Sequence, residues 1–148
     1  MQFGHEKLDV YRVSVQYAAW AYQAAKPLKG VDRHARDQLL RASQSIPLNI
    51  AEGNGKGTSA DRRRFFEIAR GSALECGAIQ DCLEAFGTLT ADDNAHGKRL
   101  LTRIVSMLTK LGQRDHEVRE VLGWYDGVDH DNDNDNEIDD DDCLKGGI

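Results

Sequence analysis

The sequence predicts an all-α protein: an antiparallel up-down four-helix bundle with a disordered acidic C-terminal tail. Apolar residues recur at spacings of three and four along most of the 148-residue chain, which places them on one face of a helix. Proline occurs only twice, and no useful length of chain alternates polar and apolar residues as a strand would. Four amphipathic segments joined by loops of about three to nine residues pack most simply as an antiparallel bundle.

The first predicted helix ends near Pro27 and Gly30, and one apolar stripe is expected to face the core. That stripe consists of Leu8, Tyr11, Val15, Ala18, Tyr22 and Ala25. The second helix has Asp32 as its expected N-cap and is expected to stop at Gly53. Its stripe runs through Leu39, Ala42, Ile46 and Ile50. The stretch 53–58 is too glycine-rich to be helical and predicts a loop.

The third predicted helix begins with Ser59 as its cap and ends at Gly87. Its expected core face is Phe65, Ile68, Ser72, Cys76, Ile79, Leu83 and Phe86. Thr90 and Asp93 then have the pattern of a capping box, which opens a fourth helix. The apolar residues of this helix recur near the heptad spacing, at Leu101, Ile104, Leu108, Leu111, Val118 and Leu122.

Small residues crowd the centre of the third helix, at Ala69, Gly71, Ser72, Ala73, Gly77 and Ala78. Glycine inside a helix costs roughly 1 kcal/mol relative to alanine. Close approach of another helix would offset that cost. The pattern leaves open whether this neighbour belongs to the same chain or to an adjacent subunit.

Charge divides the chain into a folded domain, residues 1–125, and a tail, residues 126–148. Through Tyr125 there are 18 Lys and Arg against 15 Asp and Glu, a net charge of +3, whereas the tail holds one Lys against ten acids, a net charge of −9. So acidic a run cannot bury enough apolar surface to offset the entropy of ordering it, which predicts disorder.

The tail contains acids at the spacing of a calcium-binding loop, namely Asp131, Asp133, Asp135, Glu137, Asp139 and Asp142. Position 6 of that register is Asn136, where an EF-hand requires glycine, and no helices are expected on either side. We therefore interpret the tail as a solubilising or charge-masking segment, with weak calcium binding as the alternative.

Several classes of protein are excluded by what the sequence lacks. No stretch approaches the roughly 20 apolar residues of a membrane span, and the N-terminus has no apolar signal segment. Cys76, Cys82 and Cys143 form no CxxC pair, which predicts reduced thiols in a cytoplasmic protein. The histidines show no metal spacing, the loop at 53–59 does not match a phosphate-binding GxxxxGK[ST] motif, and no catalytic pairing stands out. We expect no cofactor, no metal and no catalysis.

A polar stripe runs down one face of the second predicted helix and consists of Arg41, Ser45, Asn49 and Glu52. Ser72 and Glu75 lie at matching depth on the third helix, so Arg41 is expected to reach Glu75. We predict a polar network that fixes helix register or a subunit interface. A ligand-binding or catalytic site is the alternative.

A basic cluster opens the third predicted helix, with Lys56 in the preceding loop and Arg62, Arg63 and Arg64 in the first turns. Free amides and the positive end of the helix dipole attract anions there. The cluster predicts a phosphate-contact surface, which could be extended by Lys98, Arg99 and Arg103 near the start of the fourth helix. The alternative is an ordinary solvated face that pairs with Asp61 and Glu67.

Two motifs in this order resemble one bacterial family: QLLRASQSIPLNIAEG at residues 38–53 and RFFEIARGSALE at residues 64–75. A weaker match at Phe3 and at LDVY, residues 8–11, extends the resemblance over residues 3 to about 120. The family is that of four-helix-bundle proteins encoded in intervening sequences of 23S ribosomal RNA genes. It includes the accessory variability determinant of diversity-generating retroelements.

The resemblance implies an up-down four-helix bundle, a homopentamer and no catalysis. In the retroelement members, a basic surface of the ring binds nucleic acid and a reverse transcriptase. Two hypotheses follow. The first is a non-enzymatic homo-oligomeric adaptor that binds RNA, DNA or a nucleic-acid enzyme through its basic surface. The second is a structural or protein-interaction oligomer that binds no nucleic acid.

Overall fold

The computed structural model describes the backbone of residues 1–121 and the side chains of residues 1–114. This part of the chain consists of four α-helices and two short 3-10 turns, with no β-strand. The helices are α1 (Asp9–Ala25), α2 (Arg33–Asn54), α3 (Ser59–Ala85) and α4 (Ala91–Val121), and the 3-10 turns are Gly4–Lys7 and Gly30–Asp32. The all-α prediction is confirmed. The predicted tail at 126–148, its calcium-loop spacing and the Val118 and Leu122 side chains lie outside the described residues.

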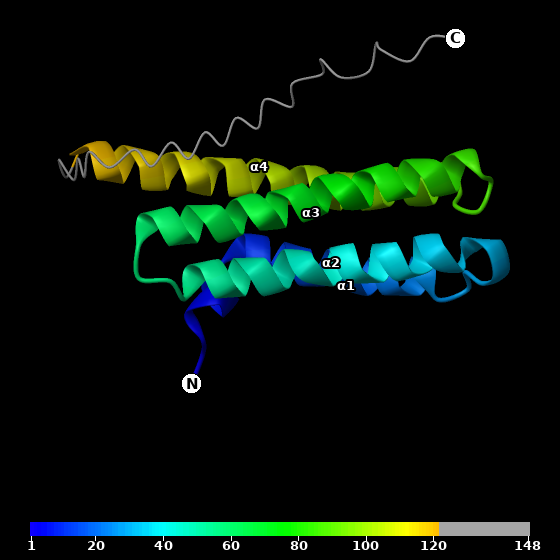
Figure 1. Cartoon of the computed structure of the whole chain (residues 1–148), viewed down its shortest axis with the longest axis horizontal. Coiled ribbons are helices and arrows are strands. Elements are labelled where there is room, and N and C mark those ends of the chain that lie inside the picture. The colour runs from blue at the N-terminus through cyan, green and yellow to red at the C-terminus, as the bar shows by residue number, and fades with distance from the viewer. Residues whose placement is uncertain (122–148) are drawn as a thin grey trace, which may run out of the picture.

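The four helices form an up-down bundle in which each helix runs opposite to the one before it (Figure 1). In the described part of the chain, each helix packs on its two neighbours and not on the diagonal one: α1 on α2 and α4, and α3 on α2 and α4. The N-terminus, the α2–α3 connection and the end of α4 all lie at one end of the bundle (Figure 1). The opposite end holds the α1–α2 and α3–α4 connections, and we call it the turn end.

The predicted core stripes of α2 and α4 are confirmed. Leu39, Ala42, Ile46 and Ile50 are buried on α2, and Leu101, Ile104 and Leu108 are buried on α4, with Leu111 partly buried. They pack together with buried residues of the other two helices into one apolar core. Burying apolar surface of this kind is the main favourable contribution to folding.

The predicted stripe of α1 was only partly right: Ala25 is buried and Leu8 and Tyr11 pack against the core. Val15 and Tyr22 are 43% and 51% exposed, and the buried face consists instead of Val10, Val13, Ser14, Tyr17, Ala21 and Ala25. Helix α1 carries apolar residues on two adjacent faces, so periodicity alone does not select the face that meets the core.

The predicted stripe of α3 was only partly right. Cys76, Ile79 and Leu83 are buried as expected, but Ile68 and Phe86 are exposed. In the first half of the helix the buried face is displaced by one residue, to Phe66, Ala69 and Ala73. Many small residues surround these positions, which weakens the apolar periodicity from which the face was predicted.

Two helix caps set where α3 and α4 begin. The Asp61 amide donates to Thr58 Oγ1 at 3.2 Å, so Thr58, and not the predicted Ser59, is the N-cap of α3. The Asp93 amide donates to Thr90 Oγ1 at 3.1 Å, as expected of a capping threonine. Asp32 flanks the start of α2 but makes no side-chain cap bond.

Two glycines have different roles at helix ends. Gly87 follows α3 with a positive φ of 77°, a conformation that favours glycine and stops the helix there. Gly53 does not stop α2, which continues to Asn54. A Cβ atom on Gly53 would lie 2.9 Å from Phe65 Cβ and 3.0 Å from Phe66 Cε1. Glycine at position 53 therefore allows α2 and α3 to approach closely beside their connection.

Candidate functional site

The predicted cluster at the start of α3 is held partly by ion pairs. Lys56 Nζ lies 3.1 Å from Glu52 Oε1, and Arg63 Nε lies 3.4 Å from Glu67 Oε1. All four side chains are more than a third exposed, so each pair is expected to contribute less than about 1 kcal/mol to stability. These two cations are thus already paired with acids, although only loosely.

Aromatic rings contact three cations of the cluster, Lys56, Arg62 and Arg64. Lys56 Nζ lies 5.1 Å from the centre of the Phe65 ring, and the guanidinium of Arg64 lies 5.7 Å from that ring. The Arg62 guanidinium lies 5.6 Å from the centre of the Phe66 ring. Cation–π contacts orient the positive groups without neutralising them. Arg64 faces no carboxylate among the described side chains.

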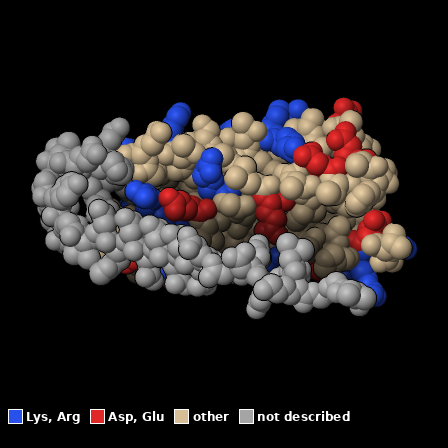
Figure 2. Space-filling view, turned by 45° about the horizontal axis from the view of Figure 1, so that its top comes forward, with Lys and Arg blue, Asp and Glu red and all other residues tan. Residues whose placement is uncertain are grey.

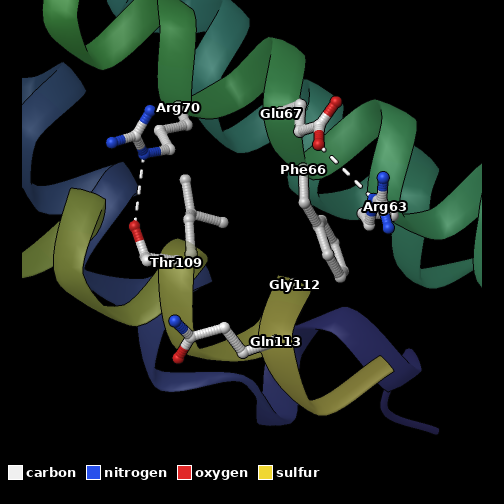
Figure 3. A pocket seen from close by; sticks show the side chains of 8 residues that line it. Arg63, Phe66, Glu67, Arg70, Thr109, Gly112 and Gln113 are labelled. Atoms are coloured by element: carbon white, nitrogen blue, oxygen red, sulfur yellow. Dashed lines mark hydrogen bonds and ion pairs between the residues drawn. The ribbon is translucent and has the colours of Figure 1, made fainter. Parts of the chain in front are cut away.

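A groove of about 530 Å³ lies between α3 and α4 beside this cluster (Figure 3). It is lined by Arg63, Phe66, Glu67 and Arg70 of α3 and by Leu108, Thr109, Gly112 and Gln113 of α4. Arg70 Nε donates to Thr109 Oγ1 at 3.2 Å across the groove. A neutral hydroxyl leaves the charge uncompensated, and within residues 1–114 Arg70 has no acidic partner.

Two further cations lie on the adjoining part of α4. Lys110 and Arg114 line a second groove, between α1 and α4, together with Asp9. Asp9 forms its ion pair with Arg12, and neither Lys110 nor Arg114 is paired with a described carboxylate. We call the whole set the basic end: Lys56, Arg62, Arg63, Arg64, Arg70, Lys110 and Arg114.

Sequence reasoning did not include Arg70, Lys110 and Arg114 in the candidate site. Arg70 lies two turns after Arg63 on the same helix, and Arg114 lies one turn after Lys110. These spacings were visible in the sequence. The missing step was the pairing of α3 with α4, which brings the late residues of α4 beside the early residues of α3.

The structure places Lys98, Arg99 and Arg103, the predicted extension of the cluster, in the first half of α4 and away from the start of α3. Lys98 Nζ lies 2.7 Å from Asp81 Oδ1, near the end of α3. Asp81 follows Arg64 by 17 residues, which is about 25 Å along a helix. Because α4 is antiparallel to α3, its first turns lie at the turn end. Lys, Arg, Asp and Glu side chains alternate along the face in Figure 2 and form no single basic patch there.

The predicted polar stripe of α2 meets α3 in two places. Arg41 Nη2 lies 3.5 Å from Glu75 Oε1, and the Ser45 and Ser72 hydroxyls are 2.8 Å apart. Asn49 Nδ2 donates to the Ser45 carbonyl at 2.8 Å and to Ser45 Oγ at 3.0 Å. Glu52 pairs with Lys56 and so belongs with the basic end. That these contacts fix helix register or a subunit interface stays a prediction.

A buried chain of hydrogen bonds runs from α1 through α3 to α4, and sequence reasoning did not predict it. Tyr17 Oη donates to Gln80 Oε1 at 2.5 Å, and Gln80 Nε2 donates to Asn94 Oδ1 at 3.0 Å. Asn94 Nδ2 then donates to Glu84 Oε2 at 2.7 Å and to Asp81 Oδ1 at 3.2 Å. Each member has a partner, which is the condition under which buried polar groups stabilise a fold.

The groups with shifted pKa values belong to the core and to this chain. Burial raises the pKa of the Tyr17 phenol, and burial raises the pKa of the Cys76 thiol to about 12. The hydrogen bond from Lys98, and then that from Asn94, lowers the pKa of Asp81. None of the three lines the groove beside Arg70. A protonated, buried thiol is a poor nucleophile.

The described residues offer neither a cluster suited to a metal ion nor a membrane-spanning helix. They contain no group of three or more His, Cys, Asp or Glu side chains that could hold a metal ion. None of the helices within residues 1–121 combines the length and the apolar character that a membrane span requires.

A family model described as 23S rRNA-intervening sequence protein matches residues 6–110. The match spans α1, α2, α3 and α4 as far as Lys110. No curated protein matches the sequence. The resemblance carried by the two motifs in α2 and α3 is confirmed.

Proposed function

The chain belongs to the 23S rRNA-intervening sequence protein family, and on this premise we propose that it is a non-enzymatic, cytoplasmic, homo-oligomeric adaptor that binds nucleic acid through its basic end. The phosphate backbone is the ligand, and the contact is sequence-independent. The free thiols of Cys76 and Cys82 fit a reducing compartment.

One observation carries this proposal. Arg64, Arg70, Lys110 and Arg114 lie at one end of the bundle and have no acidic partner among the described side chains. Unpaired cations repel one another, so a fold that gathers them gains nothing unless an anion binds there. The amino end of α3 lies in the same region, and its dipole favours negative charge.

The shape of the groove favours backbone contacts over base recognition. Phe66 lies at its floor, but only 2% of this residue is exposed, so no face of the ring is free to stack on a base. The Phe65 ring is already covered by Lys56 and Arg64. Arg63 and Arg70 on the rim are suited to phosphate oxygens, which carry no sequence information.

The oligomeric part of the proposal is supported by the outer face of α3. A Cβ atom on Gly71 would meet no heavy atom within 4 Å, and one on Gly77 would meet only ordinary contacts from 3.7 Å. Packing within the chain therefore does not require either glycine, each of which costs roughly 1 kcal/mol in a helix. A helix of an adjacent subunit would account for them, and the family resemblance implies five subunits.

A shallow groove on the same face adds to this support. It has a volume of about 520 Å³ and is lined mostly by small or apolar residues, among them Ala73, Leu74, Gly77, Ala78, Leu101 and Val105. Leu74 is 53% exposed in the single chain. A subunit interface here would bury that apolar surface.

The test compares nucleic-acid binding by full-length variants that lose the same charge at different places. One carries Arg64→Gln, Arg70→Gln and Lys110→Gln, and its control carries Arg33→Gln, Arg99→Gln and Arg103→Gln. Dissociation constants for duplex RNA, single-stranded RNA and DNA are measured by fluorescence anisotropy at several salt concentrations. We expect the basic-end variant to lose at least about tenfold in affinity and the control to lose less than about threefold.

The salt dependence provides a second readout. Each lost phosphate contact should reduce the slope of log affinity against log salt by about 0.7 to 0.9. Equal losses in the two variants would assign binding to overall charge and contradict the role of the basic end. Absence of salt-sensitive binding by any form would contradict the proposed function.

A second candidate is a structural or protein-interaction oligomer that binds no nucleic acid. It is favoured by the pairing of Lys56 with Glu52 and of Arg63 with Glu67, which withdraws two cations from the candidate surface. This alternative predicts an intact oligomer in analytical ultracentrifugation together with no nucleic-acid binding at low salt. Binding to a nucleic-acid enzyme in place of nucleic acid would give the same pair of results.

A further inference from the structure

The chain leaves the described part of the bundle next to the basic end. Helix α4 brings Thr109 against Arg70 and Gln113 into the same groove as Arg63. Val121, the last described residue, follows Gln113 by eight residues, or about 12 Å of helix. The coloured end of α4 in Figure 1 accordingly lies beside the α2–α3 connection.

The sequence that follows has the opposite charge to this end. Residues 126–148 contain ten acids and one lysine, and six of the acids fall between Asp126 and Glu137. Arg64, Arg70, Lys110 and Arg114 face no described carboxylate. The most acidic stretch of the sequence therefore begins five residues after Val121, the last described residue of the helix that carries two of these cations.

The intervening length allows contact. Asp129 follows Val121 by eight positions, and eight residues span up to about 28 Å when extended. The return path to Gln113 is only about 12 Å. Covalent attachment also gives the segment an effective concentration in the millimolar range, so a weak electrostatic contact is enough to occupy the surface.

The turn end is a poorer place for the same segment. Its lysine on α4, Lys98, already pairs with Asp81, and it lies 23 residues before Val121, which is about 35 Å along the helix. Asp92, Asp93 and Glu84 also lie at the turn end and would repel an acidic segment.

We propose that the acidic segment from Asp126 to Asp142 docks on the basic end of its own bundle and competes there with nucleic acid. The docking stands independently, whereas the competition rests on the proposed function. Carboxylates beside Arg70, Lys110 and Arg114 would take the place of phosphates, so only a polyanion that outcompetes the tethered segment would bind.

Docking is tested by zero-length carbodiimide crosslinking, which joins a lysine to a carboxylate in contact with it. Crosslinked peptides from the full-length protein are identified by mass spectrometry at 50 mM and 500 mM salt. We expect links from Lys110 and Lys56 to residues 126–142 at low salt, and their loss at high salt. Lys26 and Lys29 at the turn end are the internal controls.

Mixing isotope-labelled and unlabelled protein distinguishes the two possible sources of the segment. Crosslinks only between peptides of the same isotopic form support docking on the same chain. Crosslinks between labelled and unlabelled peptides would instead show docking on a second copy and overturn the proposal. Absence of links to Lys110 and Lys56, or equal links to Lys26 and Lys29, would overturn docking altogether.

Competition is tested with full-length charge variants and a duplex RNA probe. One variant carries Asp→Asn at 129, 131, 133 and 135, and its control carries Asp→Asn at 32, 37, 92 and 93. We expect the first to bind at least about fivefold more tightly than wild type at low salt, with a smaller gain at high salt, and the control to change little.

The outcomes separate the two proposals. Equal gains in both variants would overturn competition and leave only an effect of net charge. Crosslinks without RNA binding by any variant would keep docking and overturn the proposed function. RNA binding by wild type without crosslinks would keep the proposed function and overturn docking.

Discussion

The two ends of the bundle differ in whether their polar side chains are paired with one another. At the turn end, Gln80 bonds to Tyr17 of α1 and to Asn94 of α4, Asn94 donates to Asp81, and Lys98 pairs with Asp81. At the basic end, Arg70 and Lys110 have no acidic partner among the described side chains. The first arrangement ties three helices together, whereas the second leaves charge exposed.

Burial explains why the difference matters energetically. Gln80 is fully buried, so loss of a partner there leaves a polar group without a hydrogen bond and without water. The cations of the basic end are exposed or half-buried, so water solvates them and their contribution to stability is small. The buried polar residues of the turn end therefore stabilise the fold, whereas the cations of the basic end remain exposed or partly exposed to solvent.

The largest expected effect tests the buried chain. Gln80→Ala removes the partners of Tyr17 and Asn94 and leaves a cavity, so it should lower the free energy of unfolding by about 3 kcal/mol. Gln113→Ala, an exposed position at the basic end, should change it by less than about 0.5 kcal/mol. Urea unfolding measures both. Equal losses of stability in the two variants would contradict the proposed difference between the turn end and the basic end.

Two glycines of α4 provide the next comparison. A Cβ atom on Gly97 would lie 2.6 Å from Gln80 Nε2 and 2.6 Å from Trp20 Cη2, so Gly97→Ala should cost about 2 kcal/mol. A Cβ atom on Gly112 would meet nothing within 4 Å, so Gly112→Ala should stabilise the helix by up to about 1 kcal/mol. Opposite signs in thermal or urea unfolding are expected. A stable Gly97→Ala protein would show that the turn end tolerates repacking.

Two lysines of α4 allow a paired and an unpaired charge to be compared in their effect on stability. Lys98→Gln breaks the contact with Asp81 and should lower the free energy of unfolding by about 0.5 kcal/mol. Lys110→Gln removes a repelled cation and should leave stability unchanged or slightly higher. The difference should shrink in 0.5 M salt, where exposed charges are screened. A loss with Lys110→Gln equal to that with Lys98→Gln would imply an acidic partner for Lys110.

The smallest effect is expected from acid titration of Asp81. Lys98 and then Asn94 lower its pKa in the folded protein, so its stabilisation is present above the ordinary value of 3.8 and is lost as pH falls through the lowered pKa. The side chain is 58% exposed, which limits the effect to a few tenths of a kcal/mol. Wild type and Asp81→Asn should therefore converge in stability at low pH. A difference in stability that persists at low pH would show that Asp81 stabilises the fold by something other than its charge.

Sequence periodicity predicted the helices well and their core faces unevenly. The α2 stripe was correct: Leu39, Ile46 and Ile50 are buried, and Leu48 is the only large apolar residue of this helix that is mostly exposed. The α1 stripe was only partly right, because Val15 and Tyr22 belong to a second apolar face that is exposed. Gln80 was not foreseen, since a polar residue on an apolar face becomes structural only when its partners are known.

The candidate site was also predicted only in part, because some of its residues come together only when two helices pack. The run of arginines at 62–64 is local and was visible in the sequence. Arg70, Lys110 and Arg114 join it only through the antiparallel pairing of α3 with α4. That pairing also places Lys98 near Asp81, so the expected extension of the cluster was inconsistent with the up-down topology that the sequence predicted.

The positions of several cations at the basic end depend on Gly53, a residue of the neighbouring helix. The two phenylalanines that press against its Cα also carry Lys56, Arg62 and Arg64 on their rings. A methyl group at position 53 would meet Phe65 at its Cβ atom and Phe66 at its ring, so both side chains, and with them the cations they contact, would have to shift. The place where this protein displays positive charge is thus set by the absence of a single carbon atom on the neighbouring helix.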